Sequence, residues 1–337
     1  MPEKKVLVGI SVGDVHGIGV EIIMNAFTKS NLLDKCIPII FCPHQIFADY
    51  LKLINSVNSD ISFIKSFDDI TENKINVFQT EKFQHKVELG KPSQDSALIA
   101  YKSLEISSAY LKNQMIDSLV TAPIDKYQIR KSAPNFIGHT EYLENQFEGK
   151  SLMVMLSEKM KIAFISGHIP LNEVSENIKE DKIINKTIQL NNSLKKDFKI
   201  SNPKIAVLGL NPHAGENGMF GDEETKTIAP AIEDAKKKGI LASGPYSPDT
   251  IFLRHQAGEF DAVVAMYHDQ ALVPLKLMGF GKSVNITLGL PLIRTSVDHG
   301  TAFDRAANFN SDSSSMEAAI QSALRLCRNS IVAGDAN

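Results

Sequence analysis

The sequence predicts an α/β protein built on mostly parallel sheets. Short apolar runs alternate along the whole chain with longer segments of helical periodicity, and this alternation is typical of parallel strands joined and covered by helices. Several apolar runs end in glycine or in polar and ionisable residues, as strands do where they present chemistry at the carboxyl edge of a sheet. No internal repeat or low-complexity segment interrupts the pattern.

The apolar runs are the expected strands, because each is too short for a helix of its own. The run 262–266 is the clearest, since it is followed at once by His268 and Asp269. Residues 152–156 and 161–165 are separated by a short polar turn, which predicts adjacent strands. The other expected strands are residues 6–10, 37–42, 117–120 and 204–210.

Helices are expected where apolar residues recur at steps of three and four. Such a stripe predicts a helix over 93–111. Acidic residues at the start of 223–238 and lysines at its end match the dipole of a helix. A capping-box pattern, Ser314 with Glu317, precedes the helix expected over 315–332. The other expected helices begin near residues 20, 45, 138, 181 and 249.

The length of 337 residues suits two domains, although a single (β/α)8 barrel has a similar size. A domain boundary is expected in the polar segment 128–135, which carries a proline. The net charge of -3 predicts no general attraction to nucleic acid or to an anionic membrane. A phosphate ligand would therefore have to be held by local basic residues.

Cysteine usage and the start of the chain predict a cytoplasmic protein. The three cysteines include no C-x-x-C pair, so buried free thiols are expected rather than disulfides or a cysteine zinc site. Lys4 and Lys5 are followed by an apolar run, 6–12, that is too short for the core of a signal peptide. No stretch is long enough to span a bilayer.

Three histidines follow apolar strand candidates within a few residues: His168, His213 and His268. Because parallel strands have their carboxyl ends at one edge, three imidazoles separated in sequence can converge there. Three neutral imidazoles suit a divalent transition metal and leave coordination positions open for substrate. The alternative is that each is a solitary histidine at the edge of the sheet, and for the set the two interpretations stay open.

A second group, Lys276, Asn285 and Arg294, combines two cations with an amide and suits a phosphate or carboxylate. The alternative for each cation is a solvated surface charge. The segment 281–283 is not a P-loop, because the position of the leading glycine holds Lys276. Neither H-E-x-x-H nor G-x-S-x-G occurs. These residues indicate a metal-assisted reaction on a small anionic substrate, without separating a hydrolase from a dehydrogenase.

Longer motifs resemble the 4-hydroxythreonine-4-phosphate dehydrogenase family, over essentially the whole chain and in order. They are GHTEYL at 138–143, NPHAGE at 211–216, YHDQ at 267–270 and the long segment 279–302, together with TAPIDK at 121–126, HIPL at 168–171 and GPYSPDT at 244–250. One loop departs from the family pattern Gly-Asp-Pro-Ala-Gly-Ile-Gly-Pro-Glu. It reads GDVHGIGVE at 13–21, and the loss of two prolines predicts a less rigid loop with an unusual His16.

The resemblance implies NAD-dependent oxidation of 4-phosphooxy-L-threonine to 2-amino-3-oxo-4-phosphooxybutanoate, which loses CO2 to give 3-amino-2-oxopropyl phosphate in pyridoxal 5'-phosphate (vitamin B6) biosynthesis. It implies NAD bound without a Rossmann fingerprint, with NADP as the open alternative, and a divalent metal for which zinc, magnesium, manganese and cobalt are all compatible. It also implies a homodimer with the isocitrate/isopropylmalate dehydrogenase-like fold and an active site in the interdomain cleft. In that fold residues 1–126 with 275–337 form the NAD-binding domain, and residues 127–274 form the central, metal-binding and dimer-forming domain.

The resemblance also implies roles for individual residues. The metal ligands would be His168, His213 and His268, with His268 supplied by the partner subunit. The substrate would be bound by His139, Thr140, Lys276, Asn285 and Arg294. The cofactor loop would be Asp298, His299, Gly300, Thr301 and Ala302. The base that removes the hydroxyl proton is expected to be Asp249 or Asp269, the alternative being that each aspartate is a hydrogen-bonded partner of a histidine.

Three other functions stay open at this point. The closest is a paralogous dehydrogenase of erythronate 4-phosphate or threonate 4-phosphate, which the residues contacting the substrate amine would distinguish. A rival of another class is a three-histidine metal-dependent hydrolase or lyase without NAD, and the loop 298–302 speaks against it. A non-catalytic metal- or phosphate-binding protein is least favoured, because two separate ligand groups are present.

Overall fold

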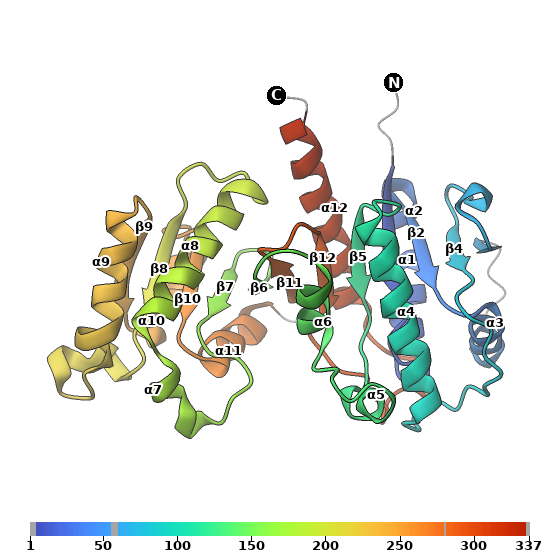
Figure 1. The fold of residues 1–337 in the computed structure, drawn as a ribbon, viewed down its shortest axis with the longest axis horizontal. Coiled ribbons are helices and arrows are strands. Elements are labelled where there is room, and N and C mark those ends of the chain that lie inside the picture. The colour runs from blue at the N-terminus through green and yellow to red at the C-terminus, as the bar shows by residue number, and fades with distance from the viewer. Residues whose placement is uncertain (1–4, 55–59, 280, 335–337) are drawn as a thin grey trace. The chain divides into compact units, whose positions relative to one another are not determined.

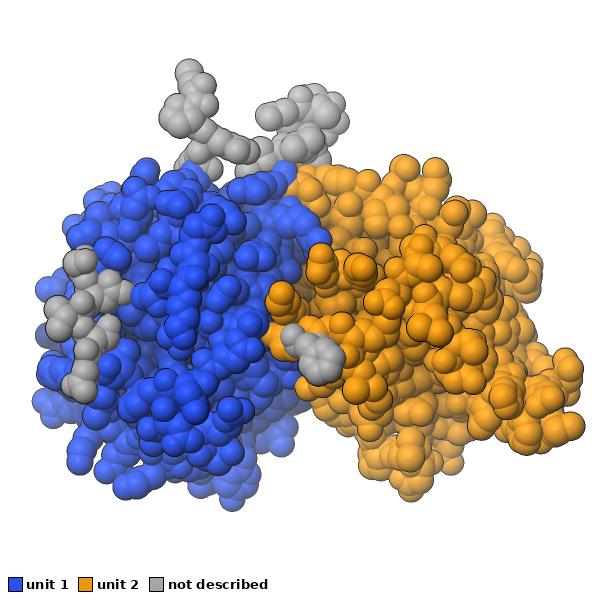
Figure 2. Space-filling view, turned by 180° about the vertical axis from the view of Figure 1, so that it is seen from behind, with its two compact units in different colours: residues 1–149, 290–328 blue, residues 150–289, 329–337 orange. Residues whose placement is uncertain are grey.

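Two units, each with its own set of strands, make up the chain (Figure 1 and Figure 2). The structure is a computed structural model that describes residues 5–54, 60–279 and 281–334. Unit 1 comprises residues 1–149 and 290–328, and unit 2 comprises residues 150–289 and 329–337. The first unit is therefore discontinuous, and both divisions fall later than the expected 126/127 and 274/275. The difference arises because segments after residue 126 pack into the core of unit 1 and residues 284–288 pair with a strand of unit 2.

Six parallel strands form the sheet of unit 1. Their order, β3-β4-β2-β1-β5-β12, runs outward from β1 in both directions, so β1 and β5 flank a switch point of the kind that binds ligands at its carboxyl edge. Ser11 and Ser296 both lie opposite Thr121, so the ends of β1, β5 and β12 are level. The bounds are β1 (Val6–Ser11), β2 (Cys36–Phe41), β3 (Ile61–Ile64), β4 (Ile75–Phe78), β5 (Ser118–Thr121) and β12 (Arg294–Val297).

Helices cover both faces of this sheet, as expected for the α/β class. Leu119 packs with Leu104 of α4 and Leu143 of α6 on one face. On the other face Thr295 donates a hydrogen bond to the carbonyl of Ala319 in α12. The helices are α1 (Gly19–Thr28), α2 (Leu32–Lys35), α3 (His44–Leu53), α4 (Gln94–Lys112), α5 (Lys126–Ser132), α6 (His139–Gln146) and α12 (Ser314–Gly334), with a 3-10 turn at Phe67–Asp69.

The sheet of unit 2 is mostly parallel, in the order β11-β6-β7-β10-β8-β9. β6 runs antiparallel to both of its neighbours, and its pairing with β7 confirms that residues 152–156 and 161–165 form adjacent strands. β7, β10, β8 and β9 are parallel, so their carboxyl ends share one edge. The bounds are β6 (Leu152–Leu156), β7 (Lys161–Phe164), β8 (Lys204–Leu208), β9 (Leu241–Tyr246), β10 (Ala262–Ala265) and β11 (Val284–Leu288).

The core of unit 2 joins β7, β8 and β10 to the helices α10 and α11. The helix expected over 223–238 is present, but its first turn is π-helical, Glu224–Ile228. The helices are α7 (Val174–Asn177), α8 (Glu180–Lys196), α9 (Ala229–Lys237), α10 (Pro248–Gln256) and α11 (His268–Gly279), with 3-10 turns at Leu171–Glu173 and Pro212–Gly218. None of the helices in the described ranges is long and apolar enough to cross a membrane.

The unusual glycine loop after β1 is held by its histidine. His16 is only 1% exposed, and its Nδ1 lies 2.6 Å from the carbonyl oxygen of Lys91. Its Nε2 lies 2.9 Å from Nε2 of His85, and the backbone N–H of Ile18 donates to the carbonyl of Thr301. The hydrogen bonds of His16 thus restrain a loop that has valines at positions 15 and 20. The three cysteines are buried and free, as expected.

Candidate active site

Four predicted site residues line up along the carboxyl edge of unit 2. His168 follows β7, His268 follows β10, His213 follows β8 and Asp249 follows β9. Because these strands are neighbours in that order, the loops occur along the edge as His168, His268, His213 and Asp249. Parallel strands therefore bring together residues that are up to 100 positions apart, as the sequence predicts.

Hydrogen bonds beyond the strand ends hold these loops together. The N–H and hydroxyl of Ser166 donate to the carbonyl of Met266, which links the ends of β7 and β10. Gln270 accepts from the N–H of Met266 and donates to the carbonyl of Gly209, which links β10 to β8. The N–H of Gly209 donates to the carbonyl of Tyr246, which links β8 to β9. The edge is thus a continuous hydrogen-bonded scaffold.

His168 and His268 form a pair, with ring centroids 5.1 Å apart. Nδ1 of His268 lies 2.6 Å from Oδ1 of Asp269, so the carboxylate favours a proton on Nδ1 and leaves the lone pair of Nε2 for a ligand. Lys186 of α8 donates to the carbonyls of Phe164 and Ile165 just before His168. Burial lowers the pKa of this ammonium group.

His213 and Asp249 line a pocket of about 310 Å³ together with Tyr267 and Gln270. The hydroxyl of Ser247 donates to Oδ1 of Asp249 at 2.5 Å, and Asp249 is exposed. Asp249 is therefore accessible to a small molecule in this pocket, whereas Asp269 contacts His268. This geometry agrees with a histidine-partner role for Asp269 and leaves Asp249 as the candidate base.

The loop that carries His213 has an uncommon backbone. Residues 213–217 all have positive φ values, from 41 to 79°, a region that costs free energy for residues other than glycine. The buried carboxylate of Glu224 compensates: its Oε1 accepts the N–H groups of Leu210 and Asn211, both at 2.7 Å. Its Oε2 accepts from the side-chain amide of Asn211 at 2.9 Å.

The three predicted metal ligands do not form one cluster within a single chain. His168 and His268 are paired while His213 lines the neighbouring pocket, and the described residues contain no group of three or more side chains placed to hold a metal. The donor set itself suits a divalent metal, because imidazoles bind such ions and Asp269 orients His268.

In unit 1, Arg294 is the first residue of β12 and is 2% exposed. Its Cα lies opposite Leu119, yet its guanidinium donates from Nε (3.2 Å) and Nη2 (2.6 Å) to Oγ1 of Thr121. The side chain therefore runs along the sheet toward the carboxyl edge. Burial lowers the pKa of Arg294 to about 10, against the opposing effect of Glu141, so the group is charged at neutral pH.

His139 and Thr140 begin α6, whose amino-terminal cap is Gly138. Gly138 has no side chain to cap the helix, and no side-chain capping hydrogen bond is present there. Nε2 of His139 is buried and has no hydrogen-bond partner among the residues that the structure describes. Burial, followed by the nearby cations Arg294 and Lys126, moves the pKa of His139 well below its usual value. A neutral imidazole with an unused nitrogen is suited to hydrogen-bond a bound ligand.

The predicted cofactor loop, residues 298–302, follows β12. It contacts the glycine loop, because a side chain on Gly17 would come within 2.6 Å of the carbonyl oxygen of Thr301. A side chain on Gly300 would instead meet open space, and His299 and Thr301 are half-buried. Two backbone loops at one switch point, with an open glycine between half-buried residues, fit a nucleotide that lies along the sheet edge.

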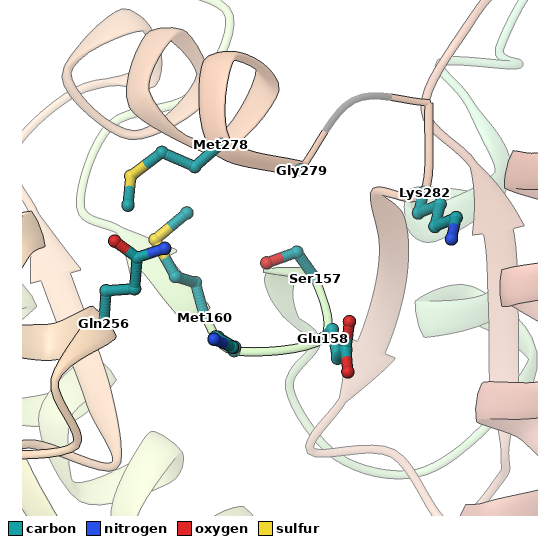
Figure 3. A pocket seen from close by; sticks show the side chains of 8 residues that line it. Ser157, Glu158, Met160, Gln256, Met278, Gly279 and Lys282 are labelled. Carbon is teal, nitrogen blue, oxygen red and sulfur yellow. The ribbon is translucent and has the colours of Figure 1, made fainter.

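The remaining predicted substrate residues belong to unit 2. Lys276 is exposed on α11, and Asn285 is half-buried on β11 with an Oδ1 atom that lacks a hydrogen-bond partner within the described ranges. A separate pocket of about 330 Å³ lies at the opposite edge of this sheet, before β7, where Ser157 faces Met160, Gln256 and Met278 (Figure 3). None of the predicted site residues lines it.

Several residues with clear structural roles at the site were not predicted. Thr121 has the same signal as the histidines, a polar residue at the end of an apolar strand. Glu224 and Lys186 have no local signal, because their partners are distant in sequence.

A mostly parallel α/β fold with histidines, a carboxylate and a buried arginine at its carboxyl edges is typical of an α/β enzyme. The chain belongs to the family described as "Pyridoxal phosphate biosynthetic protein PdxA", whose family model matches residues 34–323. It is 37% identical to the 4-hydroxythreonine-4-phosphate dehydrogenase of Bacteroides thetaiotaomicron, over 98% of this chain and 91% of that protein.

Two further relatives bear on function. A protein of Oceanobacillus iheyensis, provisionally named D-threonate 4-phosphate dehydrogenase, is 38% identical over 96% of this chain and 98% of its own length. The crystal structure of 4-hydroxythreonine-4-phosphate dehydrogenase from Klebsiella pneumoniae superposes with a TM-score of 0.85 at 33% identity, covering 96% of this chain and 100% of that one.

Proposed function

We propose that this protein is a 4-hydroxythreonine-4-phosphate dehydrogenase. It would oxidise 4-phosphooxy-L-threonine at its secondary hydroxyl with NAD, and the β-keto acid product would lose CO2. The family match over residues 34–323 carries this proposal, and the relatives with that name support the substrate. The metal-dependent hydrolase alternative has no comparable support.

The protein groups have distinct tasks in this reaction. Arg294 and Lys276 neutralise the phosphate, and the neutral His139 donates or accepts a hydrogen bond at the substrate. These contacts fix the carbon that is oxidised, which lowers the entropic barrier to reaction. Asp249, exposed in the pocket beside His213, accepts the hydroxyl proton, while Asp269 orients His268. When bound, the nicotinamide cofactor takes up the hydride and a divalent metal polarises the hydroxyl and stabilises negative charge.

The other assignments follow from the same proposal. His168, His213 and His268 would hold the metal, with His268 supplied by the partner subunit of a homodimer. Residues 298–302 would hold the NAD adenosine. A cytoplasmic location is supported by three free, buried cysteines, since disulfides form mainly in oxidising compartments.

The second candidate is the threonate 4-phosphate or erythronate 4-phosphate dehydrogenase, which the Oceanobacillus iheyensis relative favours. The two substrate classes differ in the amine. We would mix the protein with NAD and a divalent metal and follow NADH formation with 4-phosphooxy-L-threonine, D-threonate 4-phosphate and erythronate 4-phosphate. Preference for the amino acid, abolished by a chelator, supports the proposed function. Preference for an amine-free acid moves the enzyme to sugar-acid metabolism, and no activity with any of the three rejects both.

A further inference from the structure

Lys126 lies in the same short segment as Thr121, the residue that holds Arg294. The segment 121–126 leaves the end of β5 and enters α5, with Lys126 as the first residue of the helix. The carboxylate of Asp125 already caps this helix by accepting the N–H of Gln128 at 3.1 Å. A cation in the first turn opposes the helix dipole, so helix stability does not account for a lysine at this position.

The ammonium group of Lys126 is directed to the start of α6. A Cβ atom on Gly138 would lie 3.1 Å from Nζ of Lys126, 3.3 Å from its Cε and 2.8 Å from Oε2 of Glu141. Gly138 has an extended backbone, with φ at 174°, which any residue can adopt. The ammonium group of Lys126 and the carboxylate of Glu141 therefore both lie against the backbone of Gly138, next to His139.

Lys126 is an exposed cation without a committed partner. Within the described residues its side chain has no hydrogen bond or ion pair, although Glu141 is the carboxylate that shares the space above Gly138. Lys126 and Arg294 both lower the pKa of His139 electrostatically, so both cations lie near this neutral imidazole. Nε2 of that imidazole is buried and unused. Two positive charges beside an unpaired ring nitrogen match a doubly charged anion with several acceptor oxygens.

We infer that Lys126 is a further substrate-binding residue, which contacts the phosphate group beside Arg294 and His139. The inference rests on the proposed function for its substrate, but the anion site can be tested without turnover. The test compares wild type with Lys126→Gln, which removes the charge, and Lys126→Arg, which keeps it. Lys131→Gln is the matched control, because Lys131 is on the same helix and its ammonium lies over the ring of Tyr127 instead.

Titration with inorganic phosphate by calorimetry is the first readout. We expect Lys126→Gln to weaken phosphate binding about 10-fold or more, because a charge-assisted contact is lost. Lys126→Arg should restore much of the affinity and Lys131→Gln should leave it unchanged. Thermal melting verifies that each variant is folded. Unchanged phosphate affinity in Lys126→Gln, or no phosphate binding by the wild type, overturns the inference.

Steady-state kinetics supply the second readout. Lys126→Gln should raise KM for 4-phosphooxy-L-threonine much more than it lowers kcat, and should leave KM for 4-hydroxy-L-threonine, which lacks the phosphate, unchanged. An equal rise for both substrates would mean that Lys126 binds another group and would overturn the inference. If the wild type oxidises no phosphorylated substrate, the proposed function fails. A phosphate isotherm that depends on Lys126 would still uphold the anion site in that case.

Discussion

Two N–H groups of the Arg294 guanidinium converge on a single hydroxyl oxygen, Oγ1 of Thr121, at 3.2 and 2.6 Å. Both side chains are buried, with Arg294 2% and Thr121 0% exposed. A buried cation needs compensating hydrogen bonds to remain charged. Thr121 is therefore a positioning residue, because it fixes the direction of the guanidinium at the carboxyl edge of β5.

Replacing Thr121 by valine tests this role. Thr121→Val keeps the volume but removes the acceptor, and a hydrogen bond to a charged group contributes about 1.5–3 kcal/mol. We expect KM for the phosphorylated substrate to rise about 10-fold with a smaller change in kcat. Thr121→Ser keeps the hydroxyl and should behave like the wild type. Equal kinetic constants for the valine and serine variants would contradict the role.

The loop that carries His213 depends on the carboxylate of Glu224. In Glu224→Gln a single carbonyl oxygen replaces two charged acceptors, so the loop N–H groups that Glu224 now binds are less well satisfied. We expect the free energy of unfolding to fall by about 2 kcal/mol and metal affinity to fall with it, since His213 loses its support. Denaturant melts and metal titrations measure the two effects.

Glu223→Gln is the control for that variant, because the carboxylate of Glu223 binds the side chains of Ser175 and Asn211 rather than the N–H groups of Leu210 and Asn211. It should change stability less. If the two glutamine variants are equally stable and bind metal equally well, the backbone contacts of Glu224 do not support the His213 loop.

The edge histidines and the fold class could be predicted, because both depend on local patterns. Alternating apolar runs specify parallel strands, and His168, His213 and His268 each follow one directly. The support of those residues could not be predicted in the same way. Glu224 and Lys186 act through hydrogen bonds to backbone groups at other strand ends, and no sequence spacing encodes these pairings.

Element ends and unit boundaries were also difficult to predict, for physical reasons. The helix expected to begin near residue 138 starts at His139, after Gly138, whereas the helix expected over 223–238 begins with a π-helical turn at Glu224–Ile228. The division at 149/150 follows from the packing of α5 and α6 into the core of unit 1. The division at 289/290 follows from the pairing of β11 with β6 of unit 2. Burial of this kind is a property of the folded chain, and the polar, proline-containing segment 128–135 could not reveal it.

His255 predicts a loss of stability in acid. It is 2% exposed; its Nδ1 donates to the carbonyl of Phe260 and its Nε2 accepts the N–H of Lys161. Burial lowers the pKa of His255 below its usual 6.5, so below that pH the unfolded chain binds more protons than the folded one. Stability should be constant above pH 6.5 and fall as the pH decreases toward the folded pKa.

Thermal melts between pH 7.5 and 5.5 test this prediction, with His255→Gln as the comparison. The variant lacks the titrating group and should lose less stability over the same interval. Other buried histidines contribute to the total, so the difference between the two curves is the relevant quantity. Parallel curves would mean that His255 does not titrate differently in the folded and unfolded states.

Asp269→Asn separates the two roles that the sequence leaves open for Asp269. If Asp269 orients His268, the variant should bind Co²⁺ or Zn²⁺ about 10-fold more weakly. Loss of a residue that orients a metal ligand can weaken metal binding more than this, but the carboxylate of Asp269 is exposed, so a small effect is expected. Its kcat should then recover at saturating metal. If Asp269 is instead the base, kcat should stay low at any metal concentration. The corresponding variant Asp249→Asn is expected to show that second behaviour.

The metal site predicts complementation between inactive variants. The described part of one chain holds no cluster of three ligands, and we propose that His268 reaches the site of the other subunit. Mixing His168→Ala with His268→Ala, under conditions that allow subunit exchange, should then restore activity, because one of the two sites in the heterodimer regains all three histidines. Mixing His213→Ala with His268→Ala should do the same, whereas His168→Ala with His213→Ala should not.

The same mixtures also test whether His213, rather than His268, is exchanged between subunits. His168 and His268 are paired within one chain, which is the arrangement that this alternative requires. Recovery only in the mixtures that contain His213→Ala would mean that His213 is the residue exchanged between subunits. No recovery in any mixture, despite verified exchange, would mean that each site is built within one chain.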